Sequence, residues 1–218
     1  EVEAYADEIT IDPLGNMICR VGQGGPKILV AAHMDEIGIM AMFKEPKSGF
    51  LRFSNLGGLL HTTLSGNRVK FEDGALGVIG VHANGGESRT TVPKLDHFYI
   101  DVDDGKGSTF EEGVPASFWR EFEMRGNRAV GKAMDDRIGC VVAIEAMKRL
   151  NKQTPNEVYF VFTVQEEVGI RGARTAGYGV DPDIAVALDV TLTGDSPHGA
   201  KMAVKLGGGA VCVDIVNF

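Results

Sequence analysis

The stretch EVYFVFTVQEEVGIRGA, from Glu157 to Ala173, joins a run of apolar residues to an abrupt pair of acids. Six of the seven residues from Val158 to Val164 are apolar, which is typical of a strand buried on both faces. The run ends in Gln165 and two adjacent carboxylates, Glu166 and Glu167. Because buried carboxylates are costly unless something pairs with them, the end of this strand requires a partner for its acids.

Three further apolar runs have the same character and predict core strands: KILVAA (27–32), IGIMAMF (37–43) and DIAVALDV (183–190). Between them, Asp135–Leu150 carries apolar residues at spacings of three and four, which predicts a helix with one buried face. That face consists of Ile138, Val141, Val142, Ala146, Met147 and Leu150, and Asp135 or Asp136 is placed to cap the helix. Strand–helix–strand order predicts an α/β fold with a mixed, largely parallel sheet flanked by helices.

The middle of the chain has a different pattern. From about Gly57 to Asn127 it is rich in Gly, Thr, Asp and Lys, and strand signals recur about every ten residues. This predicts a small inserted β-barrel-like domain. The predicted organisation is a catalytic α/β domain at 1–57, the inserted domain at 58–127, and the second part of the catalytic domain at 128–218.

The composition excludes several classes of protein. Of 218 residues, 44% are hydrophobic and 24% charged, with 22 basic and 30 acidic side chains. No Lys/Arg-rich run is present, so no nucleic acid and no anionic membrane is expected as a partner. No apolar run approaches the roughly 20 residues that cross a bilayer. Three widely spaced cysteines predict buried small hydrophobes in a reducing, cytoplasmic environment.

Four polar clusters follow the apolar strands or open the helix: His33–Glu36, Asp135–Asp136, Glu166–Glu167 and Asp189. Sites in open α/β sheets form at the carboxyl ends of strands, so these side chains are expected to converge. One or two divalent metals would neutralise the acids, and the ligand types favour Zn, Co or Mn. Taken singly, each cluster also has a structural interpretation: a hydrogen-bonded histidine, a helix cap, or a solvated pair of acids.

Four motifs together resemble the dinuclear metal aminopeptidases of the TET type, which include glutamyl and deblocking aminopeptidases and some members described as endoglucanases. The motifs are AAHMDEIG (31–38), GKAMDDRIG (131–139), TVQEEVGIRGA (163–173) and ALDVTLTGDSP (187–197). The segment LGGLLHTTLSGNRV (56–69) also resembles the start of the inserted β domain of that family. The similarity runs along nearly the whole chain.

The resemblance implies a role for each matching residue. His33 and Asp189 are the unshared ligands of one metal, Asp135 bridges two metals, and Glu167 binds the second. Two divalent metal ions per subunit, Zn or else Co or Mn, are therefore expected. The implied function is a metallo-aminopeptidase, a hydrolase that removes the N-terminal residue of peptides with a free N-terminus by means of a metal-activated water.

The resemblance also implies two catalytic side chains and an assembly. Glu166 is the general base, and the Asp35 carboxylate orients the imidazole of His33. The peptide bond between Asp135 and Asp136 is expected to be cis. The family forms hollow homo-oligomers, often dodecamers, and the same is expected here.

The sequence departs from the family at its end. The family's chains continue past the position of Phe218 to a final histidine that binds the second metal. No other histidine is expected to replace it; those remaining are His61, His82, His97 and His198. We expect either a longer parent or a natural truncation. We also expect no stable, active monomer of 218 residues, because the strands at 183–190 and 200–216 would have unpaired edges.

Two other functions remain open at this point. A glycoside hydrolase needs two carboxyl groups and no metal, and loss of activity with a chelator would argue against it. An inactive scaffold lacking the second-site histidine would bind fewer metals per chain.

Overall fold

The computed structural model describes residues 1–82, 91–102 and 111–191, together with the backbone of 211–216. The chain forms two compact units: Glu1–Asp35 with Ala133–Phe218, and Glu36–Lys132. The predicted insert at 58–127 is therefore shorter than the compact unit. The difference arises because two strands before residue 58 pair inside that unit and not with the α/β sheet.

The first unit is built on a six-stranded sheet with the order β1-β2-β12-β3-β13-β14. Its strands are β1 (Glu8–Ile11), β2 (Met17–Val21), β3 (Lys27–His33), β12 (Glu157–Thr163), β13 (Ile184–Val190) and β14 (Val211–Val216). Only the pairs of β3 with β12 and with β13 are parallel, and the other three are antiparallel. The prediction of a mixed α/β fold is confirmed. The prediction that its sheet is largely parallel is wrong, because the strands on both sides of the central parallel pairs are antiparallel.

The prediction of an unpaired edge at β13 is also wrong. β13 lies between β3 and β14, and Ala185–Val190 pair with Val211–Val216. The predicted edge segment before Val211 lies outside the described residues.

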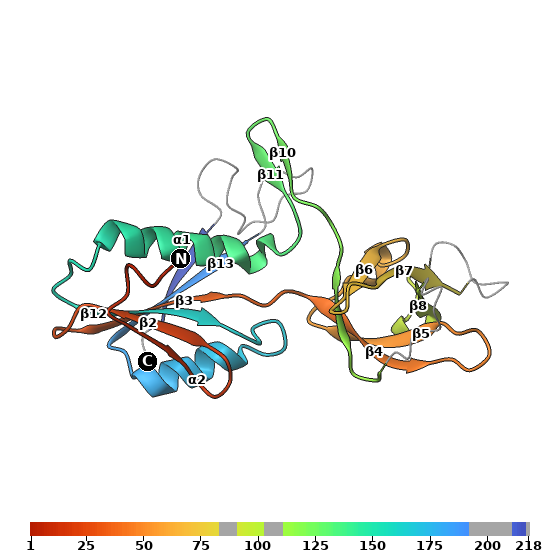
Figure 1. Ribbon diagram of the computed structural model, residues 1–218, viewed down its shortest axis with the longest axis horizontal. Helices are drawn as coiled ribbons and strands as arrows, with labels where there is room; N and C mark the ends of the chain where they lie inside the picture. Colours follow the sequence, from red (N-terminus) through yellow and green to blue (C-terminus); the bar gives the residue numbers. More distant parts are fainter. Residues whose placement is uncertain (83–90, 103–110, 192–210, 217–218) are drawn as a thin grey trace. The chain divides into compact units, whose positions relative to one another are not determined.

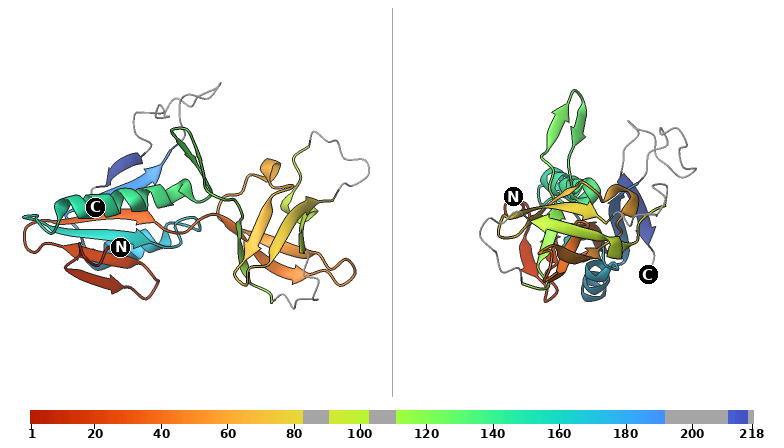
Figure 2. Two further views of the ribbon diagram at one scale, coloured as in Figure 1. Left: turned by 45° about the horizontal axis from the view of Figure 1, so that its top comes forward. Right: turned by 90° about the vertical axis from the view of Figure 1, so that its right-hand side faces the viewer.

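Two helices cover opposite faces of this sheet, α1 (Met134–Leu150) and α2 (Arg171–Val180) (Figures 1 and 2). Side chains alternate along β3, so this strand contributes to the hydrophobic cores on both faces of the sheet. Ala32 packs on the α1 side, and Leu29 and Ala31 pack on the α2 side. β12 is buried over most of its length, as its apolar run predicts.

Helix α1 turns to the sheet only part of the face predicted: Met147 is fully buried, and Ala146 and Leu150 pack against the core, as predicted. Its buried residues are Asp136, Gly139, Cys140, Ala143 and Met147, whereas Val141 and Val142 are exposed. Small residues face the sheet, which permits a close approach of helix and strands. The Asp135–Asp136 peptide bond is cis, which confirms that prediction.

The second unit is a closed barrel of six strands with the order β4-β5-β8-β7-β6-β9 (Figure 2). The strands are β4 (Gly38–Lys44), β5 (Leu51–Leu56), β6 (Arg68–Phe71), β7 (Leu76–Val81), β8 (Phe98–Val102) and β9 (Pro115–Phe118). Closure leaves no free strand edge. The core includes Ile39, Val69, Ile79, Phe98 and Ile100. β4 was predicted as a strand of the α/β sheet and belongs to this barrel instead.

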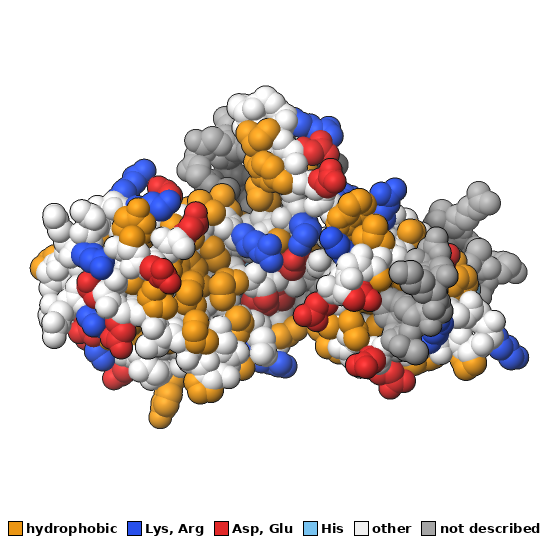
Figure 3. All heavy atoms as spheres, in the orientation of Figure 1, with side chains coloured by type: hydrophobic (Ala, Val, Ile, Leu, Met, Phe, Trp, Pro, Cys, Tyr) orange, Lys and Arg blue, Asp and Glu red, His pale blue; other side chains and the backbone are white. Residues whose placement is uncertain are grey.

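Smaller elements complete the barrel unit. They are two 3-10 turns, His61–Thr63 and Leu95–His97, and a hairpin of β10 (Glu123–Arg125) and β11 (Arg128–Val130). The hairpin exposes Met124 and Val130, and hydrophobic side chains are visible on it in Figure 3.

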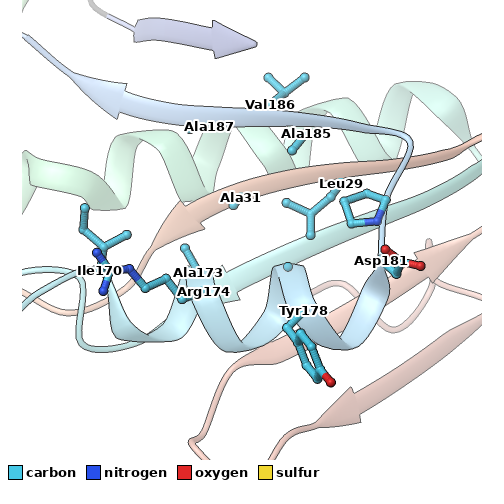
Figure 4. A pocket seen from close by; sticks show the side chains of 12 residues that line it. Leu29, Ala31, Ile170, Ala173, Arg174, Tyr178, Asp181, Ala185, Val186 and Ala187 are labelled. Carbon is cyan, nitrogen blue, oxygen red and sulfur yellow. The ribbon is translucent and has the colours of Figure 1, made fainter. Parts of the chain in front are cut away.

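An apolar pocket lies beside α2, over β3 and β13 (Figure 4). Its lining includes Leu29, Ala31, Tyr178 and Ala185. None of the predicted metal ligands lines it, so the candidate site lies elsewhere on this unit. Among the described residues, no helix has the length and apolar character needed to cross a membrane.

Candidate metal centre

The ends of three neighbouring strands bring the polar clusters to one edge of the sheet. Thr163 at the end of β12 pairs with His33 at the end of β3. On the other side, the β3–β13 ladder ends at Ala31 and Ala187, and continuing that register puts Asp189 level with His33. The β3–β13 ladder has no pair beyond Ala31 and Ala187, so His33 and Asp189 lie past its end.

His33 is the centre of the cluster, and only 3% of its side chain is exposed. Its Nε2 lies 3.0 Å from Oδ1 of Asp135 and 3.9 Å from Oε2 of Glu166. Its Nδ1 lies 3.0 Å from the main-chain oxygen of Asp35, an acceptor that fixes the plane of the ring. The imidazole thus turns Nε2 toward the carboxylates.

Asp35 makes contacts that the sequence did not predict. Its carboxylate Oδ1 is 3.6 Å from Nδ1 of His33, so the main-chain oxygen is the closer partner of the ring. The same carboxylate accepts the amide of Glu166 at 3.1 Å and that of Glu167 at 3.2 Å. Asp35 therefore fixes the backbone of the two glutamates as well as lying beside the histidine.

Asp136 is a buried acid that the sequence-based site omitted. Its side chain is fully buried and accepts the amides of His33 at 3.3 Å and Gly139 at 3.1 Å. Asp135 and Asp136 have non-helical backbone angles within α1, so the contact with Gly139 caps the regular helix that follows them, as expected for Asp135 or Asp136. Capping alone explains an acid at the start of a helix. In the sequence, only the position of Asp136 next to Asp135 indicates that it also belongs to the site.

The acids disturb one another's ionisation. Burial, and then the nearby Asp189, raise the pKa of Asp136 to about 6. Burial is also the main cause of the raised pKa of Glu166 and of Glu167, and neighbouring carboxylates add to it. Burial alone would lower the pKa of His33, but the surrounding carboxylates raise it above its ordinary value.

Two groups of side chains in the described part of the chain have ligand atoms within 4.8 Å of one another. One contains His33, Asp135 and Glu167, and the other contains His33, Asp136 and Asp189. A set of one imidazole and several carboxylates suits a divalent cation such as Zn or Mn, and a cation would offset the repulsion among these acids. The residues therefore fit a metal centre with more than one position.

Neither of these two groups, which are drawn from the described residues, contains a histidine other than His33. His61, His82 and His97 belong to the barrel unit, and His198 lies outside the described residues.

The comparisons with known proteins agree with this arrangement. A family model described as M42 glutamyl aminopeptidase matches residues 15–215. The chain belongs to the M42 glutamyl aminopeptidase family. M42 proteins are metal-dependent peptidases, and the resemblance to the TET-type aminopeptidases is confirmed.

Two curated relatives show the extent of the match. A protein of Acetivibrio thermocellus is 45% identical over 96% of this M42 chain and 63% of its own length. A lysyl aminopeptidase of Pyrococcus furiosus is 36% identical over 94% of this chain and 63% of its own. The chain thus spans about 63% of the length of these relatives.

Solved M42-like structures have the same fold. A TET aminopeptidase from a marine sediment thaumarchaeon is 36% identical, with a TM-score of 0.87 over 95% of this chain and 63% of its own. A Pyrococcus horikoshii TET peptidase, which can assemble into a tetrahedron or a large octahedral shell, is 33% identical, with a TM-score of 0.74 over 86% of this chain and 62% of its own. A Thermotoga maritima chain described as an endoglucanase is 31% identical, with a TM-score of 0.74 over 92% and 61%.

Proposed function

We propose that the protein is a metal-dependent aminopeptidase that removes the N-terminal residue from peptides. The observation that carries this proposal is the buried His33 among carboxylates from three strand ends and the start of α1, in a chain of the M42 family. The negative charge of this cluster favours a substrate whose free N-terminus is positively charged.

We assign the ligands by residue. His33 and Asp189 would hold one divalent metal, Glu167 would hold a second, and Asp135 would be a ligand shared by both. Support comes from the proximity of His33 to Asp189 and of Asp135 to Glu167, each pair within one of the two groups. Asp136 is a further acid beside His33 and Asp189. When bound, such metals acidify a water molecule and polarise the scissile carbonyl.

Glu166 is the general base in this proposal. Its side chain is partly exposed, and its Oε2 lies 3.9 Å from Nε2 of His33, so its carboxylate borders the cluster and remains open to a water molecule. Its carboxylate would take a proton from the attacking water molecule and pass that proton to the leaving amine. Asp35, through the Glu166 and Glu167 amides, keeps the base and the neighbouring ligand in fixed positions.

A glycoside hydrolase is the second candidate, and the likeness to a chain described as an endoglucanase favours it. Such an enzyme needs one protonated and one ionised carboxyl group and no metal. The shared imidazole of both residue groups supports the peptidase instead.

The test is an assay of the full-length protein on an aminoacyl-anilide, its N-acetylated form and a cello-oligosaccharide. We expect hydrolysis of the free-amine substrate alone, its loss with EDTA, and its return with Zn, Co or Mn. Hydrolysis of the sugar that persists in EDTA would refute the peptidase.

We further propose that the protein acts as a cytoplasmic homo-oligomer, with a dodecamer as the expected form. The shell-forming relative supports assembly, and Cys19 and Cys140, both free and buried, suit a reducing compartment. Light scattering on the full-length protein measures the assembly; a monomer at micromolar concentration would contradict it.

A further inference from the structure

Asn16 is a fully buried polar side chain outside the carboxylate cluster. It lies at the end of the turn between β1 and β2, where Asp12 accepts several amides of the turn. Its side-chain Nδ2 lies 2.6 Å from Oδ2 of Asp12, which holds the amide group in one orientation. Burying an amide group is costly unless its hydrogen bonds are satisfied, so the partners of Asn16 decide what it does in the fold.

The other contacts of Asn16 reach the two ends of one loop. Its Oδ1 accepts the amide of Val164 at 3.0 Å, just after β12. Its Nδ2 donates to the main-chain oxygen of Gly172 at 3.0 Å, in the first turn of α2, and lies 3.1 Å from Oγ1 of Thr175. Asn16 thus binds both ends of the loop that connects β12 to α2: Val164 at the end of the strand and Gly172 at the start of the helix.

The loop between these points carries Glu166 and Glu167. Its neck is closed by the Gly172 amide on the Val164 oxygen at 3.0 Å and the Arg171 amide on the Gln165 oxygen at 3.1 Å. A Cβ on Gly172 would lie 2.2 Å from the Val164 oxygen and 2.4 Å from Asn16 Oδ1, so the neck is packed without spare room. Asp35 holds the opposite side of the loop through the two glutamate amides.

We propose that Asn16 is a positioning residue that fixes Glu166 and Glu167 relative to His33. Asp35 and Asn16 hold the loop from two sides, one beside the imidazole and the other at the neck. The glutamates' roles as base and ligand rest on the proposed function, whereas their placement by Asn16 does not. Loss of Asn16 leaves the Val164 amide without its acceptor and frees the neck, so the loop samples positions in which Glu167 no longer faces Asp135.

The test compares Asn16→Ser with Val21→Ala in the full-length protein. Ser is too short to reach both Val164 and Gly172, whereas Val21 is a fully buried residue of the α1-side core that pairs with Val158, at the opposite end of β12 from the loop. Two quantities are measured: the dissociation constant for Zn²⁺, by competition with a chromogenic chelator, and amide exchange at Glu166 and Glu167 relative to Phe160 in β12.

We expect Asn16→Ser to raise the Zn²⁺ dissociation constant about 10-fold to 100-fold, as for other residues that orient ligands. Exchange at the two glutamate amides should rise relative to Phe160, and Val21→Ala should change neither quantity. If Asn16→Ser does not fold, Thr175→Val, at an exposed position, should produce a smaller change in the same direction.

Unchanged relative exchange in the Asn16 variant, or an equal rise in Val21→Ala, would overturn the proposal. If the wild-type protein binds no Zn²⁺, the proposed function fails, and the exchange measurement still decides whether Asn16 holds the loop.

Discussion

The stability of the metal-free protein should fall as the pH rises from 5 to 8. Asp136, Glu166 and Glu167 have a raised pKa in the folded state, so the folded protein binds more protons than the unfolded chain in this range. The raised pKa of His33 acts in the same direction, because its stabilising charge is lost as the pH passes its folded value. Acids with a lowered pKa, such as Asp12, titrate below this range and do not contribute.

Asp136 sets the magnitude. Its pKa rises from 3.8 to about 6. At about 1.4 kcal/mol per pKa unit this is about 3 kcal/mol, which screening by nearby solvent reduces to about 2 kcal/mol. Because the slope begins near the unfolded pKa of 3.8, Asp136 should lower the free energy of unfolding by about 2 kcal/mol between pH 3 and pH 8 in EDTA, of which about 1 kcal/mol falls between pH 5 and pH 8.

The assay is urea unfolding followed by circular dichroism across this pH range, for the wild type and for Asp136→Asn. The variant loses a hydrogen bond at every pH, but its curve should be flatter because the titrating acid is gone. Zn²⁺ at 100 times its dissociation constant should restore about 2.7 kcal/mol at pH 8. A metal-free stability that is constant or rises with pH, or an equal slope in the variant, would refute the reasoning.

Three further predictions concern individual side chains. Glu166→Gln should lower the rate of peptide hydrolysis about 100-fold or more and leave the Zn²⁺ affinity nearly unchanged, whereas Glu167→Gln should weaken Zn²⁺ binding. An equal loss of Zn²⁺ affinity in both variants, measured by calorimetry, would show that the roles of the two glutamates are misassigned. Asp35→Asn retains one acceptor oxygen for two amides and should reduce kcat/KM more than it reduces thermal stability; a loss confined to stability would make Asp35 structural. Ile100→Ala in the barrel core should cost about 2–5 kcal/mol in the unfolding of that unit, with Zn²⁺ affinity unaffected; reduced Zn²⁺ affinity in this variant would contradict the assignment of the metal centre to the α/β unit.

The sequence predicts the centre of the fold well because burial on both faces leaves a continuous apolar run, as in β12 and β3. It assigns β4 to the wrong sheet for the same reason. An apolar run in a barrel resembles one in an open sheet, and only the long-range pairing of Gly38 with Ser117 distinguishes them. The α1 face is predicted only in part, because Gly139 and Ala143, which allow close packing, are less hydrophobic than the exposed Val141 and Val142.

The candidate site was found largely from acids and a histidine at strand ends. Asp136 was left out because capping is the commoner reason for an acid before a helix, and here it caps and also lies beside His33. Asn16 gave no functional signal, since Asn in DPLGN reads as a turn residue. Its contacts with Val164 and Gly172 span more than 140 residues of sequence, which no local pattern records.

The central claim is that His33 and its neighbouring carboxylates hold two metals. Anomalous diffraction from crystals of the full-length protein grown with Zn²⁺ or Co²⁺ tests it most directly. We predict two peaks, one within about 2.0–2.2 Å of His33 and Asp189 and one beside Glu167, with Asp135 between them. Peaks only elsewhere in the protein, or none near His33 at saturating metal, would contradict the metal centre and the aminopeptidase function derived from it.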